Sequence, residues 1–309
     1  MTELLSVVIP THDRPERVVA AARSVLDQDI AALEVVIVDD GSRPGTTEVL
    51  DRLVDGDHRV VVVRHDEAQG ASAARNTGLD TARGELIAFC DDDDTWLPGA
   101  LARAVTAAVP GAGIVYGHHQ VLIEATGRLV TFRPPGSPTP ELLRWLDVSP
   151  SIFGVVRRDA VGDALRFDTT MATSEDWDLR LRCAEVAPMV LVPEPLYRYV
   201  QHTGTRLSST PAAHAQGHHA FVDKHRATMS SACIAHHELT YALAVRDRAA
   251  LVHQVSEVPR HPGNLGAVAL LAGEMVASRL GRRREDPGLS RRFAARSLRH
   301  ATRGRRPAR

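Results

Sequence analysis

The chain has 309 residues, with 37 lysines and arginines against 38 aspartates and glutamates. This balance excludes a uniformly basic nucleic-acid-binding protein and an acidic disordered chain. The apolar fraction is 44%, and a chain of this length can bury about three-quarters of the surface that its unfolded form exposes. We therefore expect one large domain, alone or with a small appendage.

The charge is unevenly distributed along the chain. Residues 279–309 contain 12 arginines against Glu285 and Asp286, a net charge of +10, so residues 1–278 carry −11. Such a tail suits either contact with an anionic membrane or a solvated, disordered segment. We expect no nucleic-acid partner, because the chain has few aromatic residues and none is interleaved with these arginines in a stacking pattern.

The cysteines and the apolar stretches indicate the cellular compartment of the protein. Cys90, Cys183 and Cys233 are odd in number, widely spaced and match no zinc or disulfide pattern. Residues 1–11 lack the pattern of a signal peptide, and the apolar stretch Leu265–Gly273 is far shorter than the roughly 20 residues of a membrane span. We expect a protein without disulfides that is cytoplasmic or peripheral at the inner face of the cell membrane.

The first 120 residues alternate short apolar runs with amphipathic segments. The runs are rich in β-branched residues and lack polar alternation, which is typical of strands buried on both faces. They are Leu4–Ile9, Glu34–Val38, Val60–Val63 and Leu86–Cys90. The helical patterns that follow them are Pro15–Leu26, Thr46–Leu53, Ala71–Ala82 and Pro98–Ala108. This alternation predicts a Rossmann-like, doubly wound α/β fold, in which ligands bind at the carboxyl ends of the strands.

The pattern changes in the middle of the chain. Residues 112–147 predict a strand, a turn at Gly127 and a proline-rich loop that suits a mobile segment over a site. A strand over Ser149–Val156 and a helix over Ser174–Val186 follow. From Pro211 onward the pattern is helical, with a break at residues 259–263.

These patterns divide the chain into three parts. We expect a main domain over residues 1–210, a helical C-terminal extension over 211–280 and an Arg-rich tail over 281–309.

Acidic residues follow two of the predicted strands. The second strand leads into Asp39-Asp40-Gly41-Ser42, and the fourth into Asp91-Asp92-Asp93-Asp94. One such pair alone is typical of a solvated loop, but adjacent carboxylates repel one another unless a cation neutralises them. Two acidic clusters at corresponding strand ends favour a site for a divalent cation.

Two phosphoryl-transfer interpretations require a lysine that the chain does not place suitably. The apolar strand that ends in Asp91-Asp92-Asp93-Asp94-Thr95 fits the motif of haloacid-dehalogenase phosphatases, whose first aspartate is the nucleophile. That family also needs a downstream lysine, and here Lys224 lies in a helical pattern with no suitably placed acidic pair after it. A receiver-like interpretation of Val36–Asp40 fails for the same reason.

Five motifs, taken in order, resemble family 2 glycosyltransferases. They span roughly residues 4–210 and are Ser6–Thr11, Val36–Ser42, Gly70–Gly78, Asp91–Trp96 and Ser174–Trp177. The resemblance implies the glycosyltransferase A-type (GT-A) fold, a nucleotide-diphosphate sugar donor, a divalent cation such as Mg²⁺ or Mn²⁺, and inversion at the anomeric carbon.

The resemblance also implies roles for individual residues. Carboxylates that hold a cation stabilise the departing diphosphate, and alternate residues of an extended segment share one face. The expected metal ligands are Asp91 and Asp93, with Asp93 the direct one, and His202 from a looser match around Tyr197–Ser208. The expected contacts to the nucleotide sugar are Pro10, Thr11, His12, Arg14, Asp39, Asp40, Arg75, Asp92 and Arg206.

Inversion in a single displacement needs one general base for the acceptor hydroxyl. The resemblance makes Asp176 that base, with Glu175 the alternative if the register is shifted by one. A carboxylate there also suits a first helical turn, where it complements the helix dipole. Trp177 beside it suits either stacking on an acceptor sugar or the core.

One departure from the family bears on the nucleotide. After Pro10-Thr11 the family usually has Tyr-Asn-Arg, whereas this chain has His12-Asp13-Arg14. The weaker stacking ring and the added negative charge near the base pocket keep other nucleotides open. The resemblance, in which Asp40 would hydrogen-bond the imide of a uracil or thymine base, favours a UDP-sugar, with thymidine and guanosine diphosphate sugars behind it. The expected acceptor is a sugar, a lipid-linked sugar or a small molecule, in cell-surface polysaccharide, glycolipid or natural-product glycosylation. The competing hypothesis is a non-catalytic sugar-nucleotide-binding or membrane-associated protein of the same fold.

Overall fold

The computed structural model describes residues 3–134, 136–149, 154–202 and 211–244. The chain divides into two compact units. The first contains residues 1–143 and 147–206, and the second contains residues 144–146 and 207–309. The predicted Arg-rich tail lies outside the described residues, and the predicted domain boundaries stay a prediction.

The first unit is built on one mixed sheet. Its nine strands are β1 (Leu5–Thr11), β2 (Leu33–Asp40), β3 (Val60–His65), β4 (Leu86–Phe89), β5 (Thr95–Trp96), β6 (Ile114–Ile123), β7 (Arg128–Phe132), β8 (Val155–Arg157) and β9 (Met189–Gln201). The order is β3-β2-β1-β4-β8-β6-β9-β5, and β7 pairs with β6.

The sheet has a parallel half and a mixed half. Strands β1 to β4 run parallel to one another. Strand β8 is antiparallel to both β4 and β6, whereas β9 is parallel to β6. The alternating apolar runs and helices thus gave the doubly wound α/β fold, which the structure confirms.

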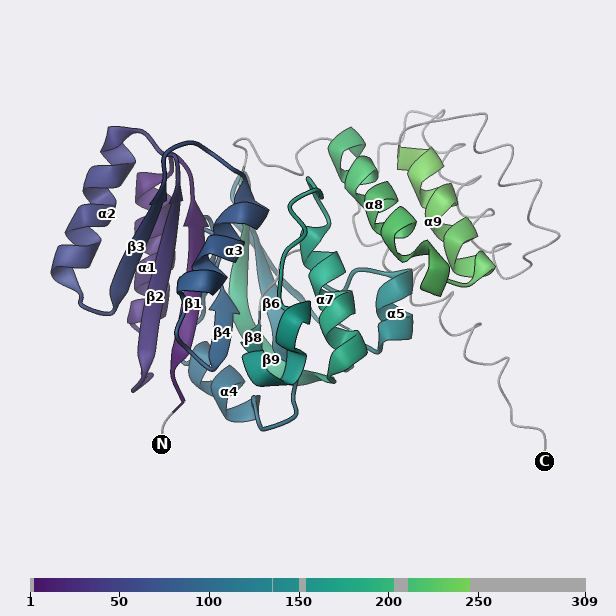
Figure 1. Ribbon diagram of the computed structural model, residues 1–309, viewed down its shortest axis with the longest axis horizontal. Coiled ribbons are helices and arrows are strands. Elements are labelled where there is room, and N and C mark those ends of the chain that lie inside the picture. Colours follow the sequence, from purple (N-terminus) through teal and green to yellow (C-terminus); the bar gives the residue numbers. More distant parts are fainter. Residues whose placement is uncertain (1–2, 135, 150–153, 203–210, 245–309) are drawn as a thin grey trace. The chain divides into compact units, whose positions relative to one another are not determined.

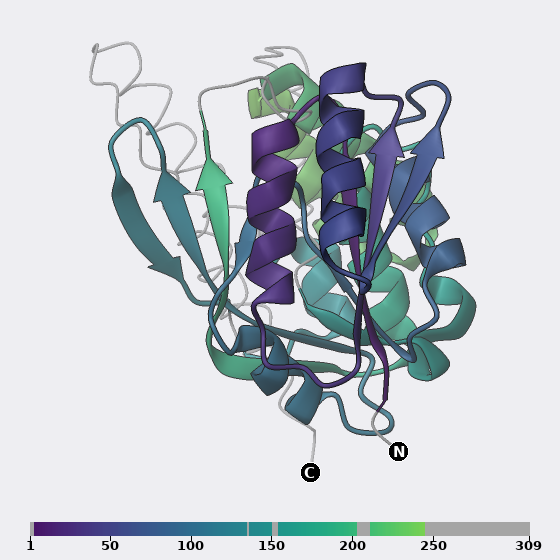
Figure 2. The same cartoon turned by 90° about the vertical axis from the view of Figure 1, so that its left-hand side faces the viewer.

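Helices cover both faces of the parallel half. The α-helices of this unit are α1 (Pro15–Leu26), α2 (Pro44–Gly56), α3 (Ala71–Thr81), α4 (Ala100–Ala107), α5 (Pro140–Trp145), α6 (Arg158–Val161) and α7 (Glu175–Val186). Figure 2 shows α1 and α2 together on the near face of the sheet, and Figure 1 shows α3 on the opposite face. Strands enclosed in this way must be apolar on both sides, which explains the absence of alternation in their sequences.

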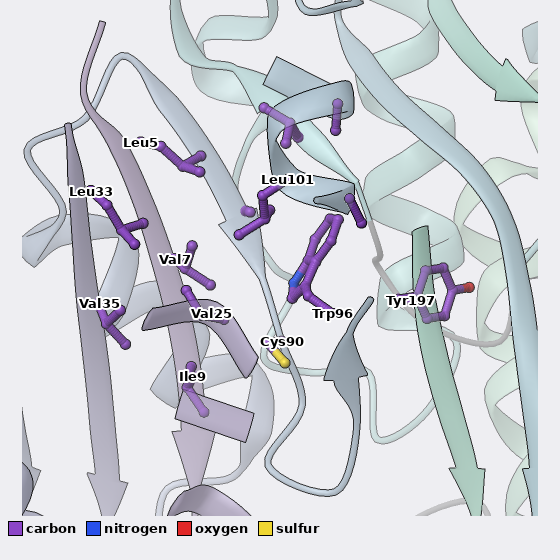
Figure 3. Packing of buried hydrophobic residues seen from close by; sticks show 14 of the residues in the cluster. Leu5, Val7, Ile9, Val25, Leu33, Val35, Cys90, Trp96, Leu101 and Tyr197 are labelled. Carbon is purple, nitrogen blue, oxygen red and sulfur yellow. The ribbon is translucent and has the colours of Figure 1, made fainter. Parts of the chain in front are cut away.

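The main core lies between the sheet and the α1 side. Alternate residues of β1, namely Leu5, Val7 and Ile9, point to this side and pack near Val25 of α1 (Figure 3). The residue between, Val8, points to the other side, where Gly78 of α3 packs against it. A Cβ at Gly78 would overlap Val8 Cγ1, so glycine allows α3 to lie close to β1.

Strand β9 was not predicted from the sequence. It contains Pro193 and Pro195, which interrupt the apolar pattern. Its pairing with β6 shifts register around His118, and it then pairs on its other edge with β5. The end of β9 leads directly to His202, so this strand delivers a residue that the sequence analysis placed at the site.

The second unit is described through two α-helices, α8 (Pro211–His225) and α9 (Ser231–Ala244). Their histidines make local contacts, with Nε2 of His218 2.5 Å from Nδ1 of His237. Of the described helices, none is long and apolar enough to cross a membrane. All three cysteines lie among the described residues, where they are buried and form no disulfide.

Candidate active site

The carboxyl ends of β1, β2 and β4 meet at one edge of the sheet. Thr11 at the end of β1 pairs in register with Asp39 of β2, and the Asp91–Asp94 segment follows β4, which pairs with β1 on its other side. Parallel pairing therefore brings both acidic clusters to the same edge, as the strand-end rule predicts.

Asp92 is held by Thr11, the last residue of β1, and by Arg14, which follows that strand. Its Oδ1 accepts a hydrogen bond from Arg14 Nη1 at 2.8 Å, and its Oδ2 accepts one from Thr11 Oγ1 at 2.8 Å. Burial raises the pKa of Asp92 to about 6, opposed by Arg14 and reinforced by the negative charge of Asp93. Arg14 also reaches Asp93 Oδ2 at 3.1 Å, so one guanidinium neutralises two neighbouring carboxylates.

Asp93 contacts a residue from the far end of the domain. His202 Nε2 lies 2.8 Å from Asp93 Oδ2, and both side chains are largely buried. The next residue, Asp94, accepts a hydrogen bond from the backbone N–H of Val200 at 2.7 Å. That bond ties the acidic loop to β9 two residues before His202 and fixes the histidine beside Asp93.

Asp91 is engaged by a buried arginine instead. Arg75 of α3 donates from Nη2 to Asp91 Oδ1 at 2.6 Å and from Nη1 to Glu175 Oε1 at 3.0 Å. Its guanidinium also lies over the ring of Phe167, 5.2 Å from the centroid. Arg75 thereby joins the acidic loop after β4 to the first turn of α7.

The first turn of α7 is reached through a strained residue. Ser174 has a φ of 65°, a left-handed conformation that non-glycine residues seldom adopt. Beyond it, Asp176 Oδ1 accepts the backbone N–H of Trp177 at 2.8 Å, and Oδ2 lies 3.3 Å from Arg180 Nη2. Trp177 is 4% exposed and donates to the carbonyl of Leu143, which places it in the core.

The loop after β2 is stabilised by its own aspartates. Asp40 accepts hydrogen bonds from the backbone N–H groups of Gln69 and Gly70, both at 2.8 Å, and its Oδ1 lies 2.7 Å from His65 Nδ1. Burial alone would raise the pKa of Asp40, but these bonds lower it below its ordinary value. Asp40 therefore fixes the N-terminus of α3, and the expected contact with a nucleotide base would have to compete with these bonds.

Three further residues that were expected to contact the nucleotide sugar lie at the turn after β2 or within β1. Asp39 accepts the backbone N–H of Ser42 at 3.1 Å and so closes the turn after β2. Pro10 is buried within β1. The His12 ring is about half exposed, and its Nδ1 lies 2.6 Å from the carbonyl oxygen of Asp40, which keeps the ring near that turn.

The side chains at the acidic edge of the sheet fit a divalent cation only in part. Among the residues that the structure describes, no group of three or more His, Cys, Asp or Glu side chains is arranged to hold a metal. Asp93 and His202 nevertheless present an oxygen and a nitrogen ligand side by side. Two protein ligands suffice for an ion that completes its coordination with phosphate oxygens and water. Asp91 Oδ1 is engaged by Arg75, and the expected role of Asp91 as a metal ligand stays a prediction.

Residues 6–153 match the protein-family model described as Glycosyl transferase family 2. This segment, slightly less than half of the chain, therefore carries a domain similar to glycosyltransferase family 2. The matched segment contains the β1, β2 and β4 ends, whereas Asp176 and His202 lie beyond it.

Two of the proteins to which the chain is similar are named as bacterial glucosyltransferases. The chain is 37% identical over 126 residues to the GalNAc(5)-diNAcBac-PP-undecaprenol beta-1,3-glucosyltransferase of Campylobacter jejuni, covering 40% of each chain. It is 30% identical over 103 residues to the UDP-Glc:alpha-D-GlcNAc-diphosphoundecaprenol beta-1,3-glucosyltransferase WfaP of Escherichia coli, covering 33% of this chain and 40% of WfaP. The matched region thus spans about two fifths of the length of both relatives.

Solved structures share the GT-A fold over most of the chain. Residues 1–349 of S. aureus TarS in complex with UDP-GlcNAc align with a TM-score of 0.62 at 15% identity, covering 99% of this chain and 93% of TarS 1–349. The mannosyltransferase PcManGT from Pyrobaculum calidifontis, in complex with GDP-Man and Mn²⁺, aligns with a TM-score of 0.61 at 18% identity, covering 98% of this chain and 87% of PcManGT. At these identities the likeness shows the fold.

The family 2 residues expected from the sequence form separate contact groups along one edge. Thr11, Arg14, Asp92, Asp93 and His202 form the first group. A second group joins Arg75, Asp91 and Glu175, and Asp39, Asp40 and His12 lie at the turn after β2. Arg206 lies outside the described residues.

The sequence analysis missed two ion-pair partners at this edge. Glu175 was considered only as an alternative base, although it pairs with Arg75. Arg180 received no role, although it lies four residues after Asp176, a spacing that places the two side chains on the same face of a helix. That spacing is the signal that could have identified Arg180.

Proposed function

We propose that this protein transfers a sugar from a nucleotide-diphosphate donor to an acceptor hydroxyl, with inversion, in the assembly of cell-surface polysaccharide. One observation carries the proposal. Arg75 bridges Asp91 to Glu175, so the acidic loop after β4 and the Asp176 end of α7 meet at a single edge of the family 2 domain. A donor-binding loop and a candidate base are thereby adjacent, as a single displacement requires.

The donor we favour is a UDP-sugar. WfaP acts on UDP-Glc, and TarS binds UDP-GlcNAc, which supports this choice. PcManGT binds GDP-Man, so a guanosine diphosphate sugar is the second candidate. His12 contributes the half-exposed ring at the turn after β2 and is the residue through which we expect the base to be contacted.

Asp93 and His202 are the residues that would hold a divalent cation. Such a cation, Mg²⁺ or Mn²⁺, would supply positive charge to the departing diphosphate. Both arginines pair with two carboxylates, but the Arg14 side chain is 32% exposed and can reach the same phosphates, whereas the Arg75 side chain is only 7% exposed. We therefore assign phosphate contact to Arg14 and a bridging role to Arg75.

Asp176 is the proposed general base. As the acceptor oxygen forms its bond to the anomeric carbon, the bond from that carbon to the diphosphate oxygen breaks, and the hydroxyl proton moves to Asp176. The carboxylate is held by the Trp177 N–H and Arg180 and is 14% exposed. It is therefore fixed in orientation but still open to an incoming hydroxyl.

The acceptor we favour is a lipid-linked sugar. The Campylobacter and Escherichia relatives are named for undecaprenol-linked substrates. The net charge of +10 over residues 279–309 would attract this protein to an anionic membrane surface where such acceptors reside. Peripheral placement at the inner membrane face follows from this proposal.

A donor and acceptor assay tests the function. The purified chain is incubated with Mn²⁺ and a panel of nucleotide sugars, and donor hydrolysis and transfer to undecaprenyl-diphosphate-linked sugars are measured. We expect turnover of at least one donor. We expect Asp176→Asn to bind that donor normally but to transfer about 10²–10⁴-fold more slowly, and Asp93→Asn to lose metal-dependent donor binding.

Asp80→Asn is the control, because Asp80 pairs with Arg166 at an exposed position away from the acidic edge. It should behave as wild type. Donor binding without any turnover would instead indicate the non-catalytic sugar-nucleotide-binding protein, and equal transfer by wild type and Asp176→Asn would refute the assignment of the base.

A further inference from the structure

Arg180 of α7 is a buried cation that reaches three acceptors. Its Nη2 lies 3.3 Å from Asp176 Oδ2 and 3.0 Å from the carbonyl oxygen of Ser149, and it also donates to Asp147 Oδ1. The side chain is 3% exposed. Burial favours its neutral form, yet Asp147 and Asp176 raise the pKa of Arg180 above its ordinary value. The group is therefore a permanent positive charge beside the candidate base.

The three acceptors compete for Arg180. An arginine Nη2 carries only two hydrogens, so it cannot serve all three fully. Asp147 makes the shortest of the three contacts and Asp176 the longest. The strength of the bond to Asp176 is consequently set by how firmly Asp147 and the Ser149 carbonyl hold the same nitrogen.

The Ser149 carbonyl is held in place from the sheet. Ser149 Oγ lies 2.7 Å from the hydroxyl of Tyr197 in β9, and the Tyr197 side chain is fully buried. Burial raises the pKa of Tyr197 well above its ordinary value, so this hydroxyl is neutral and adds no charge to the cluster. The position of Arg180 is thus defined by α7, by the segment after α5 and by β9.

We propose that Arg180 is a positioning residue that keeps Asp176 oriented toward the acceptor hydroxyl, and that Asp147 tunes this effect by competing for the same guanidinium. The inference rests on the proposed function. Arg180 does not touch the reacting atoms; it acts through the carboxylate that does. The acceptor side of the site is thereby connected to a second carboxylate outside it.

The other charges around Asp176 set the background for this effect. Glu175 and Asp147 are negative neighbours, and Arg75 is a positive one that is shared with Asp91. Removal of Arg180 would leave Asp176 with two acidic neighbours and one shared cation, and without the contact that holds its Oδ2. Removal of the Asp147 carboxylate would instead leave more of the guanidinium to Asp176.

The test follows the Asp176 carboxyl group by NMR and the reaction in parallel. Proteins labelled with carboxyl-¹³C aspartate are compared at pH 7, and the Asp176 signal is assigned by its loss in Asp176→Asn. We expect Arg180→Met to move this signal, because the contact between Asp176 Oδ2 and the guanidinium is lost, and Asp147→Asn to move it in the opposite direction. Arg180→Lys, which keeps the charge, should return most of the shift.

In the transfer assay, kcat should fall about tenfold or more in Arg180→Met, because the base is no longer held toward the acceptor hydroxyl. The KM for the donor should stay unchanged, because the hydrogen bonds described for Arg180 go to Asp147, Ser149 and Asp176.

Arg182→Met is the matched control. Arg182 pairs with Asp178 on the same helix with the same four-residue spacing, but not with Asp176. It should lower stability without moving the Asp176 signal. An unmoved Asp176 signal in folded Arg180→Met, or signal shifts of the same sign in Arg180→Met and Asp147→Asn, would overturn the inference. Absence of any transfer by wild type would refute the proposed function while leaving the NMR result to decide the role of Arg180.

Discussion

Glu34 in β2 is a buried carboxylate that binds donors from two other segments. Its side chain accepts hydrogen bonds from Ser6 Oγ of β1 and from the backbone N–H and Nε of Arg83, which precedes β4. Ser6 Oγ in turn accepts the N–H of Gly84 at 2.8 Å. Burial alone would raise the pKa of Glu34, but these donors bring it below its ordinary value.

We predict that Glu34→Gln lowers the free energy of unfolding by about 1–3 kcal/mol at pH 7, because the neutral amide turns one acceptor into a donor facing other donors. The folded pKa is depressed, so this contribution is fully present above the unfolded value near 4.5 and is lost as pH falls through the folded pKa. Denaturant unfolding at pH 7 and pH 3 should show the two proteins converging at acid pH.

Glu48→Gln serves as the control, since Glu48 is an exposed position on α2. It should unfold within about 0.5 kcal/mol of wild type at both pH values. A difference between wild type and Glu34→Gln that stayed constant down to pH 3 would contradict the role given to the Glu34 charge.

At the same scale, the sequence predicted which residues gather but not how they pair. The strand-end rule brought Asp39, Asp40 and the Asp91–Asp94 segment to one edge. The rule could not show that Arg75 bonds Asp91. That pair joins α3 to a loop 16 residues later in the chain, and the Arg75 side chain that makes the bond also packs over the ring of Phe167. Pairings of this kind depend on tertiary packing, which composition and spacing do not encode.

Helices whose ends carry clear sequence signals were predicted to within a few residues of their observed bounds. Helix α1 runs from Pro15 to Leu26 as its proline start and apolar period indicated. Helix α4 begins two residues later than predicted, because Gly99 adopts a left-handed conformation before it. Strand β9 was missed, since its prolines hide a strand whose stability comes from pairing with β6 and β5.

Helix α3 makes a close approach to β1 that one residue permits. An added Cβ at Gly78 would overlap Val8 Cγ1 and lie 3.3 Å from Val38 Cγ2. Alanine is better than glycine in a helix by about 1 kcal/mol. We nevertheless predict that Gly78→Ala lowers the free energy of unfolding by about 1–3 kcal/mol, because overpacking outweighs that gain. Guanidinium unfolding followed by circular dichroism measures the difference.

Gly45→Ala is the matched substitution on another helix. Gly45 lies in α2 with nothing within 4 Å of the added Cβ, so alanine there should leave stability unchanged or raise it slightly. Should Gly78→Ala prove as stable as Gly45→Ala, the close packing of α3 on β1 would not be limiting.

For the whole molecule, the near-zero net charge is the sum of two opposite parts. Residues 1–278 carry −11, and the acidic edge of the sheet contains several of those carboxylates. The alternating apolar runs were enough to predict the doubly wound fold, because that signal is repeated along the chain. The antiparallel strands were harder to predict, because β8 has three residues and β5 has two.

Strand β8 is the short strand that connects the parallel half of the sheet to the mixed half. Among the described residues, Val155, Val156 and Arg157 of β8 pair with β4, and two of them also pair with β6. Arg157 reinforces this connection by ion-pairing with Glu3 and by donating from Nε to the carbonyl of Ala108 at 3.0 Å. So short a connection transmits little cooperativity between the halves.

Amide hydrogen exchange should therefore report two opening free energies. We expect amides of β1 and β2 to exchange only through global unfolding, and those of β6 and β9 to exchange at a lower free energy, as measured by mass spectrometry in increasing denaturant. A single opening energy for all four strands would contradict this. We therefore expect the sheet to open as two cooperative units that meet at β8, so that the half leading to His202 opens while the half that carries Asp39 and Asp40 stays closed.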